Sequence, residues 1–151
     1  MFAFAISTVF VGCNSCQEFD TMPEFDQLQN IPGFEEVNLD CTDDVSLPRT
    51  QIVSSDSVYR ALFSPYLEQL TFCGLDSLPE IDFDNRILIW SITTDVVVDK
   101  VVTREGNTVK HIVKVKTSSF ASTRYRMNAV AIPKLAESDT LEFVTVIYGC
   151  E

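Results

Sequence analysis

The chain of 151 residues contains a single histidine and no familiar catalytic motif. His111 shares its parity with Val109, Val113 and Val115 in a run that predicts a strand, so we interpret it as a partly buried structural residue. A Ser-His-Asp site would need His111 as its base, yet the sequence has no GxSxG turn to present a nucleophile. Patterns of the types GxGxxG, GxxxxGK[ST] and HExxH are also absent. The sequence therefore nominates no catalytic residue.

Two groups of carboxylates have spacings that could do chemistry. Asp82 and Asp84 stand just before a predicted strand, where a pair of carboxylates could act as acid and base. A turn that caps the backbone is the interpretation we favour. Asp40, Asp43 and Asp44 suggest calcium, but the twelve-residue loop with its central Gly and terminal Glu is missing. The sequence predicts no metal site and no cofactor.

Five cysteines offer a further chemistry. Only Cys13 and Cys16 have CxxC spacing, and they follow an apolar N-terminal run, so neither a zinc ribbon nor a redox centre is predicted. An exported protein can form disulfides. We expect one structural disulfide among Cys41, Cys73 and Cys150, with the pair Cys41–Cys150 slightly favoured because these residues flank the regular part of the chain. Cys16 is expected to belong to a tether.

The N-terminal run has the features of an export signal. Residues 1–12 are apolar or small and carry no charge, and the run is too short to span a bilayer. Its end, Phe10-Val11-Gly12-Cys13, resembles a bacterial lipobox, in which a small residue precedes the Cys that receives lipid. Phe10 stands where Leu is usual, and no basic residue precedes the run. We favour lipidation at Cys13 over a plain cleaved signal and over a buried N-terminal strand or helix. The expected location is the bacterial cell envelope, with the protein anchored by lipid on the periplasmic or surface side.

Charge is distributed unevenly along this acidic chain. The formal net charge of −11 and the pI near 4.4 exclude a nucleic-acid binder, because neutralising phosphates requires clustered Lys and Arg. Residues 1–85 hold fifteen acidic and two basic side chains, whereas residues 86–151 hold seven acidic and nine basic ones. The acidic stretch 14–48 also contains prolines and lacks a periodic apolar pattern, which is typical of an extended arm.

Three parts of the chain follow from these features. Residues 1–12 are expected to be the signal peptide, residues 13–48 an acidic arm and residues 49–151 a single domain. Within the arm we expect residues 14–32 to be mobile and residues 34–48 to be partly packed on the domain.

The domain predicted from residue 49 onward is of the α+β class. Residues 51–54 predict a short strand, and Ser55 to Ser57 offer caps for a helix over 58–63, which Pro65 interrupts before a further turn. Strands follow at 86–93, 96–103, 108–117, 125–132 and 140–148. The strand 86–93 is expected to be central and buried on both faces. We expect one helical segment followed by a mainly antiparallel five- to six-stranded sheet, curled as a small barrel or sandwich.

Two short motifs carry a family resemblance. Ile81-Asp82-Phe83 enters one buried strand, and Ile132-Pro133-Lys134 closes the penultimate strand. With this order of elements, residues 49–148 resemble domains of exported Bacteroidota lipoproteins and, more distantly, the C-terminal domain of the PrcB family of protease-complex subunits. The Gly-rich segment of that family has no counterpart, because residues 94–100 are rich in Asp and Val. The resemblance implies secretion and a non-catalytic role beside a partner protein.

Basic residues of the second half form a candidate binding surface. Lys110, Lys114 and Lys116 share one parity of a predicted strand, and Arg124 and Arg126 share a direction at the start of the next. If the two strands paired as a hairpin, the five cations would make a positive stripe. This stripe could bind an acidic partner protein or the acidic arm; the alternative is an ordinary solvated face.

The sequence as a whole favours a binding protein. We expect a non-catalytic exported lipoprotein that acts as a binding or assembly module for an envelope or secreted protein and contacts the membrane only through its lipid anchor. The alternative is a small exported hydrolase-like enzyme with an unrecognised site.

Overall fold

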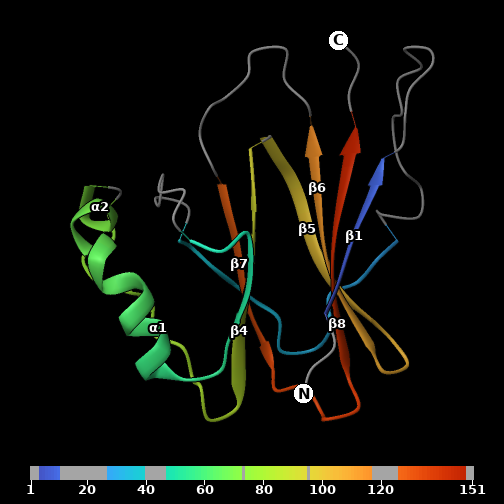
Figure 1. The fold of residues 1–151 in the computed structure, drawn as a ribbon, viewed down its shortest axis with the longest axis horizontal. Helices are drawn as coiled ribbons and strands as arrows, with labels where there is room; N and C mark the ends of the chain where they lie inside the picture. The colour runs from blue at the N-terminus through green and yellow to red at the C-terminus, as the bar shows by residue number, and fades with distance from the viewer. Residues whose placement is uncertain are drawn as a thin grey trace. The chain divides into compact units, whose positions relative to one another are not determined.

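The fold consists of two four-stranded sheets and one helical segment (Figure 1). The computed structural model describes residues 4–10, 27–39, 47–72, 74–94, 96–116 and 126–148, with only the backbone described in 4–10. Contacts group the chain into two compact units that each combine distant segments. The first unit comprises residues 1–31, 95–123 and 136–151, and the second comprises residues 32–94 and 124–135.

The sheet of the first unit has the order β1-β8-β6-β5 and mixes parallel with antiparallel pairs. Its strands are β1 (Phe4–Phe10), β5 (Val96–Glu105), β6 (Thr108–Lys116) and β8 (Thr140–Tyr148). β5 and β6 form an antiparallel hairpin whose turn places Gly106 at a φ of 57°, a conformation that favours glycine. β8 runs parallel to both β6 and β1.

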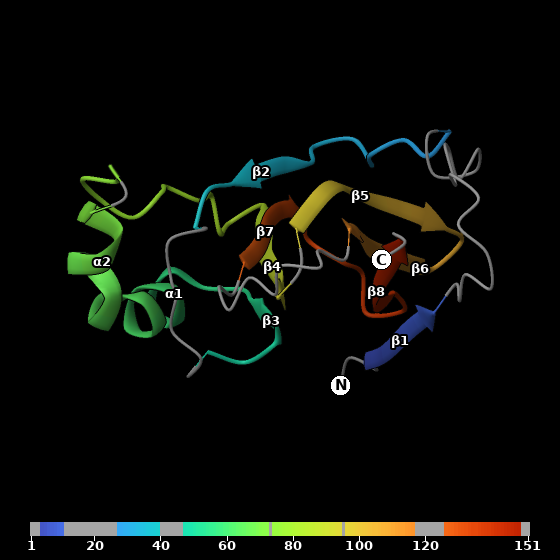
Figure 2. The ribbon, with the colours of Figure 1, turned by 90° about the horizontal axis from the view of Figure 1, so that it is seen from above.

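The sheet of the second unit has the order β2-β7-β4-β3 and is antiparallel throughout (Figure 2). Its strands are β2 (Glu35–Val37), β3 (Thr50–Val53), β4 (Arg86–Thr93) and β7 (Arg126–Pro133). Successive side chains of β4 point to opposite faces, and Leu88, Ile89 and Trp90 are all fully buried. The prediction of a central strand buried on both faces is therefore confirmed.

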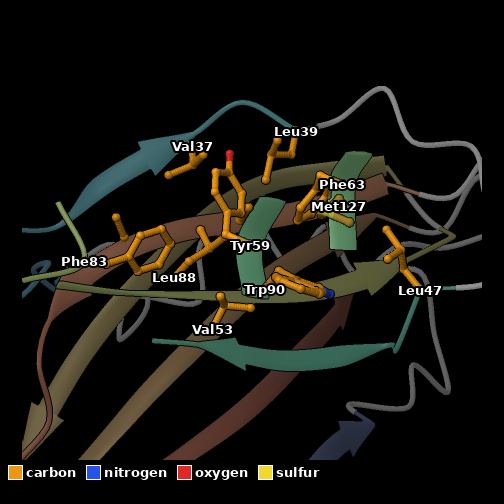
Figure 3. Packing of buried hydrophobic residues seen from close by; sticks show 12 residues of the cluster. Val37, Leu39, Leu47, Val53, Tyr59, Phe63, Phe83, Leu88, Trp90 and Met127 are labelled. Carbon is orange, nitrogen blue, oxygen red and sulfur yellow. The ribbon is translucent and has the colours of Figure 1, made fainter. Parts of the chain in front are cut away.

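The helical segment packs on one face of the second unit's sheet. It consists of α1 (Asp56–Phe63), a 3-10 turn (Ser64–Tyr66) and α2 (Leu67–Phe72). Ser55 caps α1 by accepting a hydrogen bond from the Val58 N–H. Figure 3 shows Tyr59 and Phe63 of α1 above Trp90, and the Phe63 and Trp90 rings meet edge to face with centroids 5.6 Å apart. The Trp90 Nε1–H donates to the Pro48 carbonyl at 3.0 Å, so this large core side chain has its polar atom satisfied.

The α+β class is confirmed, but the arrangement of strands differs from the expected one. Within the described ranges, eight strands form two sheets that are not closed into a barrel, in place of one sheet of five to six strands. The expected hairpin between β6 and β7 is wrong, because β6 pairs with β5 and β8 while β7 pairs with β2 and β4. Parallel neighbours need a long crossover, and the excursion of the chain through β7 supplies it between β6 and β8.

Both strands that the sequence did not predict come from the N-terminal part. β1 forms from residues that we interpreted as a signal, and β2 forms within the acidic arm. The arm was also expected to be mobile up to residue 32. Instead the Ile31 N–H donates to the Val102 carbonyl of β5, and the Val102 N–H donates to the Asn30 side chain, each at 2.8 Å. Unpaired backbone groups of an edge strand explain this attachment.

Candidate functional site

The lysines of the predicted stripe lie on one face of the first unit's sheet. Lys110, Lys114 and Lys116 alternate along β6, with Lys110 and Lys114 half-buried and Lys116 exposed. In the strand register, Glu142 of β8 stands beside Lys110, and Asp99 of β5 stands beside Lys114. Each of these two lysines therefore has a carboxylate at the neighbouring register position.

Lys110 also forms a direct ion pair, which adds a further carboxylate to this face. The Lys110 Nζ lies 2.7 Å from Oε2 of Glu105. This contact holds the pKa of Glu105 below its usual value and the pKa of Lys110 above its usual value, and Glu142 also raises the pKa of Lys110. Three carboxylates thus accompany three lysines on this face.

A small apolar cluster lies between these charges. Val101, Ile112 and Val146 come from three neighbouring strands and are buried, and the half-buried Val144 packs against them. The long aliphatic stems of lysines commonly cover such surface while their ammonium groups stay in water. The lysine face is therefore amphipathic and carries carboxylates beside its lysines.

The two arginines of the predicted stripe do not join the lysines by strand pairing. Arg126 begins β7 in the sheet of the second unit, and Arg124 lies outside the described residues. Within the described part of the arm, Glu35 forms an ion pair with Arg86 of β4. The acidic residues of the arm in 18–26 and 40–44 lie outside the described residues, so a contact between the arm and the lysines stays a prediction.

His111 occupies the face of β6 opposite to the lysines and is fully buried. Burial lowers the pKa of His111 to about 3, with a smaller contribution from the charge of Lys100. Neither ring nitrogen has a hydrogen-bond partner among the described residues. His111 is thus more deeply buried than the partly buried structural residue that its sequence pattern predicted, and its imidazole is neutral and away from the described surface.

Asp82 and Asp84, the paired carboxylates, lie in the turn before β4, where Asp82 has a structural role. The Asp82 carboxylate accepts hydrogen bonds from the Asp84 N–H at 3.1 Å and from the Asn85 side-chain amide at 2.8 Å. These bonds hold the pKa of Asp82 below its usual value. Its carbonyl also accepts from the Arg86 N–H, so Asp82 organises the entry into the central strand.

A surface depression of about 200 Å³ lies in the second unit beside β2. Its charged lining consists of Glu35, Glu36, Glu80 and Arg86, and all three glutamates are exposed. Sequence reasoning missed this group because Glu35 and Arg86 are 51 residues apart and meet only through strand pairing. Arg86 already engages Glu35, so the depression presents no free acid–base pair with that carboxylate.

A second ion pair that sequence reasoning missed fixes the entry into β8. The Arg104 guanidinium makes two bonds to the Asp139 carboxylate, at 2.8 and 3.0 Å, and the Ala136 N–H donates to the same carboxylate at 2.8 Å. The Asp139 side chain is only 3% exposed. These contacts hold the pKa of Asp139 below its usual value.

The remaining sequence candidates fall outside the described part of the chain. Cys13, Cys16 and the disulfide candidates Cys41, Cys73 and Cys150 are all among the residues that the structure leaves undescribed. Within the described ranges, no cluster of three or more metal-ligating side chains could hold a metal ion. In the same ranges, no helix has the length and apolar character needed to cross a membrane.

Comparisons with known proteins identified no relative of this chain. No protein-family model, no curated protein and no solved structure matches the chain. A function for this protein is therefore derived from its own residues.

Proposed function

We propose that this protein is a non-catalytic exported lipoprotein of the bacterial cell envelope that serves as a binding or assembly module for an envelope or secreted protein. The observation that carries the proposal is the uncharged apolar run of residues 1–12 ending in Gly12-Cys13. The acidic residues that follow suit a segment that holds a domain away from an anionic membrane surface.

The attachment of the arm limits how far the domain stands from the anchor. Asn30 and Ile31 bind the edge of β5, so a tether that starts at Cys13 reaches no further along the chain than Asn30. Fully extended, a segment of this length spans at most about 60 Å. The module would therefore work close to the membrane, within reach of other envelope proteins.

Two features support binding over catalysis. His111 is enclosed and neutral, which removes the most common general base from the described surface. The depression lined by Glu35, Glu36 and Glu80 is where a hydrolase-like enzyme, the alternative, would need its proton acceptor, and Arg86 already engages Glu35 there.

The second motif of the PrcB-type resemblance lies beside the start of β4. The Lys134 N–H donates to the Asn85 carbonyl at 3.0 Å, and Arg86 pairs by register with Pro133. The first motif, Ile81-Asp82-Phe83, precedes these partners by two residues along the chain. A role beside a partner protein is the part of the resemblance that we carry into the proposal.

Metabolic labelling with a tagged fatty acid tests the anchor. The full chain, expressed in a bacterial host behind a basic start, should take up the label and sediment with membranes. Cys13→Ser should lose both properties, whereas the control Cys16→Ser should keep them. A wild-type chain that takes up no label, or equal labelling of the Cys13→Ser variant, would overturn the proposal.

A further inference from the structure

β1 covers the outer edge of β8 along almost its whole length. The two strands run parallel in an unbroken register of seven pairs, from Phe4 opposite Leu141 to Phe10 opposite Ile147. Figures 1 and 2 show β1 beside β8 at the end of the first unit's sheet. Over residues 141–147, the backbone groups that β8 directs away from β6 therefore face β1.

The proposed cleavage before Cys13 would remove this covering strand. β1 spans Phe4–Phe10 and lies wholly within the predicted signal. In the mature protein β8 would then become the edge of its sheet, paired only with β6. A row of unpaired N–H and C=O groups over residues 141–147 would be left facing outward.

The exposed edge of β8 would lack the usual protection against pairing. The strand reads TLEFVTVIY, with no proline, no glycine and no lysine, and its single charge is Glu142. Natural edge strands that stay unpaired are short, bulged or guarded by lysine and proline. β8 has nine residues and a regular register with both neighbours. An edge strand of this kind would be expected to pair with another strand in the mature protein.

The opposite edge of the same sheet, β5, is protected against pairing with another strand. β5 has a register irregularity between Val97 and Asp99, which is typical of a bulge, and carries the charged residues Lys100 and Arg104. Its Val102 is also bound by the segment that precedes β2. One edge is thus guarded within the described domain, and the other depends on β1.

β8 would remain formed without β1. It pairs with β6 along its full length, from Thr108 opposite Thr140 to Lys116 opposite Tyr148. Its entry is fixed by the buried Asp139 carboxylate and by the Thr140 N–H, which donates to the Asn107 carbonyl at 2.8 Å. None of these contacts involves the N-terminal segment, so the edge stays preorganised.

We propose that the outer edge of β8 is a strand-acceptor site, which in the mature protein binds an extended segment of a partner polypeptide parallel to β8, in the place that β1 holds in the unprocessed chain. The inference rests on the proposed cleavage at Cys13 and gives the module its mode of binding. Main-chain hydrogen bonds supply the affinity in this mode, and alternating side chains supply the specificity.

The residues that β1 places opposite β8 predict the amino-acid pattern of the partner segment. Opposite the buried Leu141 and Phe143, the chain itself places Phe4 and Ile6, so large apolar residues are expected at alternate positions. Opposite the half-buried Val144 it places the small Ser7. Proline is excluded at the alternate positions whose N–H points toward β8, because the ladder needs those donors.

A strand-replacement experiment on the full chain tests the site. A protease recognition sequence replaces residues 14–20, the folded protein is cut, the N-terminal piece is removed in urea, and the chain is refolded with a labelled peptide. The probe is residues 1–12 followed by three lysines, and its control carries both Ser7→Pro and Thr8→Pro. We expect saturable binding of the first peptide and at least about tenfold weaker binding of the control, since one of two successive N–H groups must point toward β8 and its loss removes a ladder hydrogen bond.

A cross-link identifies where the peptide binds. Ser7 and Val144 are register partners, so a Ser7→Cys peptide should form a disulfide with the Val144→Cys protein. A Thr103→Cys protein is the matched control, because Thr103 lies on β5 at the other edge of the same sheet. Equal cross-linking at both positions, binding of neither peptide, or equal binding of both peptides would overturn the strand-acceptor site.

The two proposals can fail separately. A chain that is lipidated on Cys13 but binds no peptide would reject the strand-acceptor site and leave the lipoprotein standing. A chain that binds the peptide at Val144 but takes up no lipid would reject the lipid anchor and leave the strand-acceptor edge of β8 standing.

Discussion

The imidazole of His111 stands edge-on to the ring of Phe143, with the ring centroids 5.7 Å apart and the planes at 78°. The two residues are register partners on the adjacent parallel strands β6 and β8. Burial lowers the pKa of His111 to about 3, so between about pH 6.5 and 3 this residue is neutral in the folded protein while an unfolded chain would protonate it.

His111 should therefore make the protein sensitive to mild acid. Between pH 6.5 and 3 the unfolded chain binds a proton at this position and the folded chain does not, so stability falls as pH decreases, by about 1.4 kcal/mol per pH unit from this group. His111→Leu removes the titrating group. Urea unfolding at pH 7, 6 and 5 should show a clearly flatter pH dependence in the variant. Parallel stability curves for the two proteins would contradict the assignment.

Ile89 tests the core of the second unit. It is fully buried in the central strand β4, so Ile89→Ala should lower the free energy of unfolding by about 2–5 kcal/mol. Leu67→Ala on α2 is the control, because Leu67 is 42% exposed and its truncation should change stability by no more than about 0.5 kcal/mol. Equal losses in denaturant titration would show that β4 is not the centre of this core.

Asp139 tests the entry into β8. Its pKa is held down by Arg104 and by the Ala136 N–H, so its contribution to stability is present above about pH 4 and is lost as pH falls through the lowered folded pKa. Asp139→Asn should lower the denaturation midpoint at pH 7 and weaken the acid dependence below pH 4. Asp56→Asn, in the exposed pair with Arg60, is the control and should have a much smaller effect. An equal loss of stability in the two variants would show that the Arg104–Asp139 pair contributes no more than the exposed Arg60–Asp56 pair.

The lysine face gives an electrostatic prediction. Glu105 and Glu142 accompany Lys110, so removing both carboxylates by substitution with Gln should expose a positive surface. The double variant should be retained by an anionic resin at low salt and released near physiological ionic strength, where the screening length is about 8 Å. Wild-type protein should pass through the resin. Retention of the wild type equal to that of the variant would show that the lysine face is already positive.

Much of the secondary structure follows from local sequence. Ser55 supplies the cap of α1, Pro65 interrupts the helical segment, and the β-branched runs of β4 and β6 adopt the strands that their composition favours. The burial of Trp90 and His111 could also be inferred, because each lies in a run of apolar β-formers. The role of Asp82 could be inferred because its turn depends on residues two to four positions further along the chain.

Strand partners were decided only by the tertiary structure. The side chains of a strand specify which face is buried, but several strands can satisfy the same alternation, so β6 could pair with β8 in place of β7. The same reason applies to charge. The sequence displays Lys110, Lys114 and Lys116 as a positive row, whereas the fold sets Asp99, Glu105 and Glu142 beside them from other strands.

Residues 4–10 show most clearly which properties depend on the sequence alone and which depend on the tertiary structure. Their composition alone is suited both to an export signal and to a strand, because both require a short uncharged apolar segment. Only the fold supplies β8, whose unguarded edge matches these residues in seven consecutive pairs. The sequence determined that this segment is apolar and where it ends, and the long-range hydrogen-bond ladder decided what it covers, since an edge exists only once the rest of the sheet has formed.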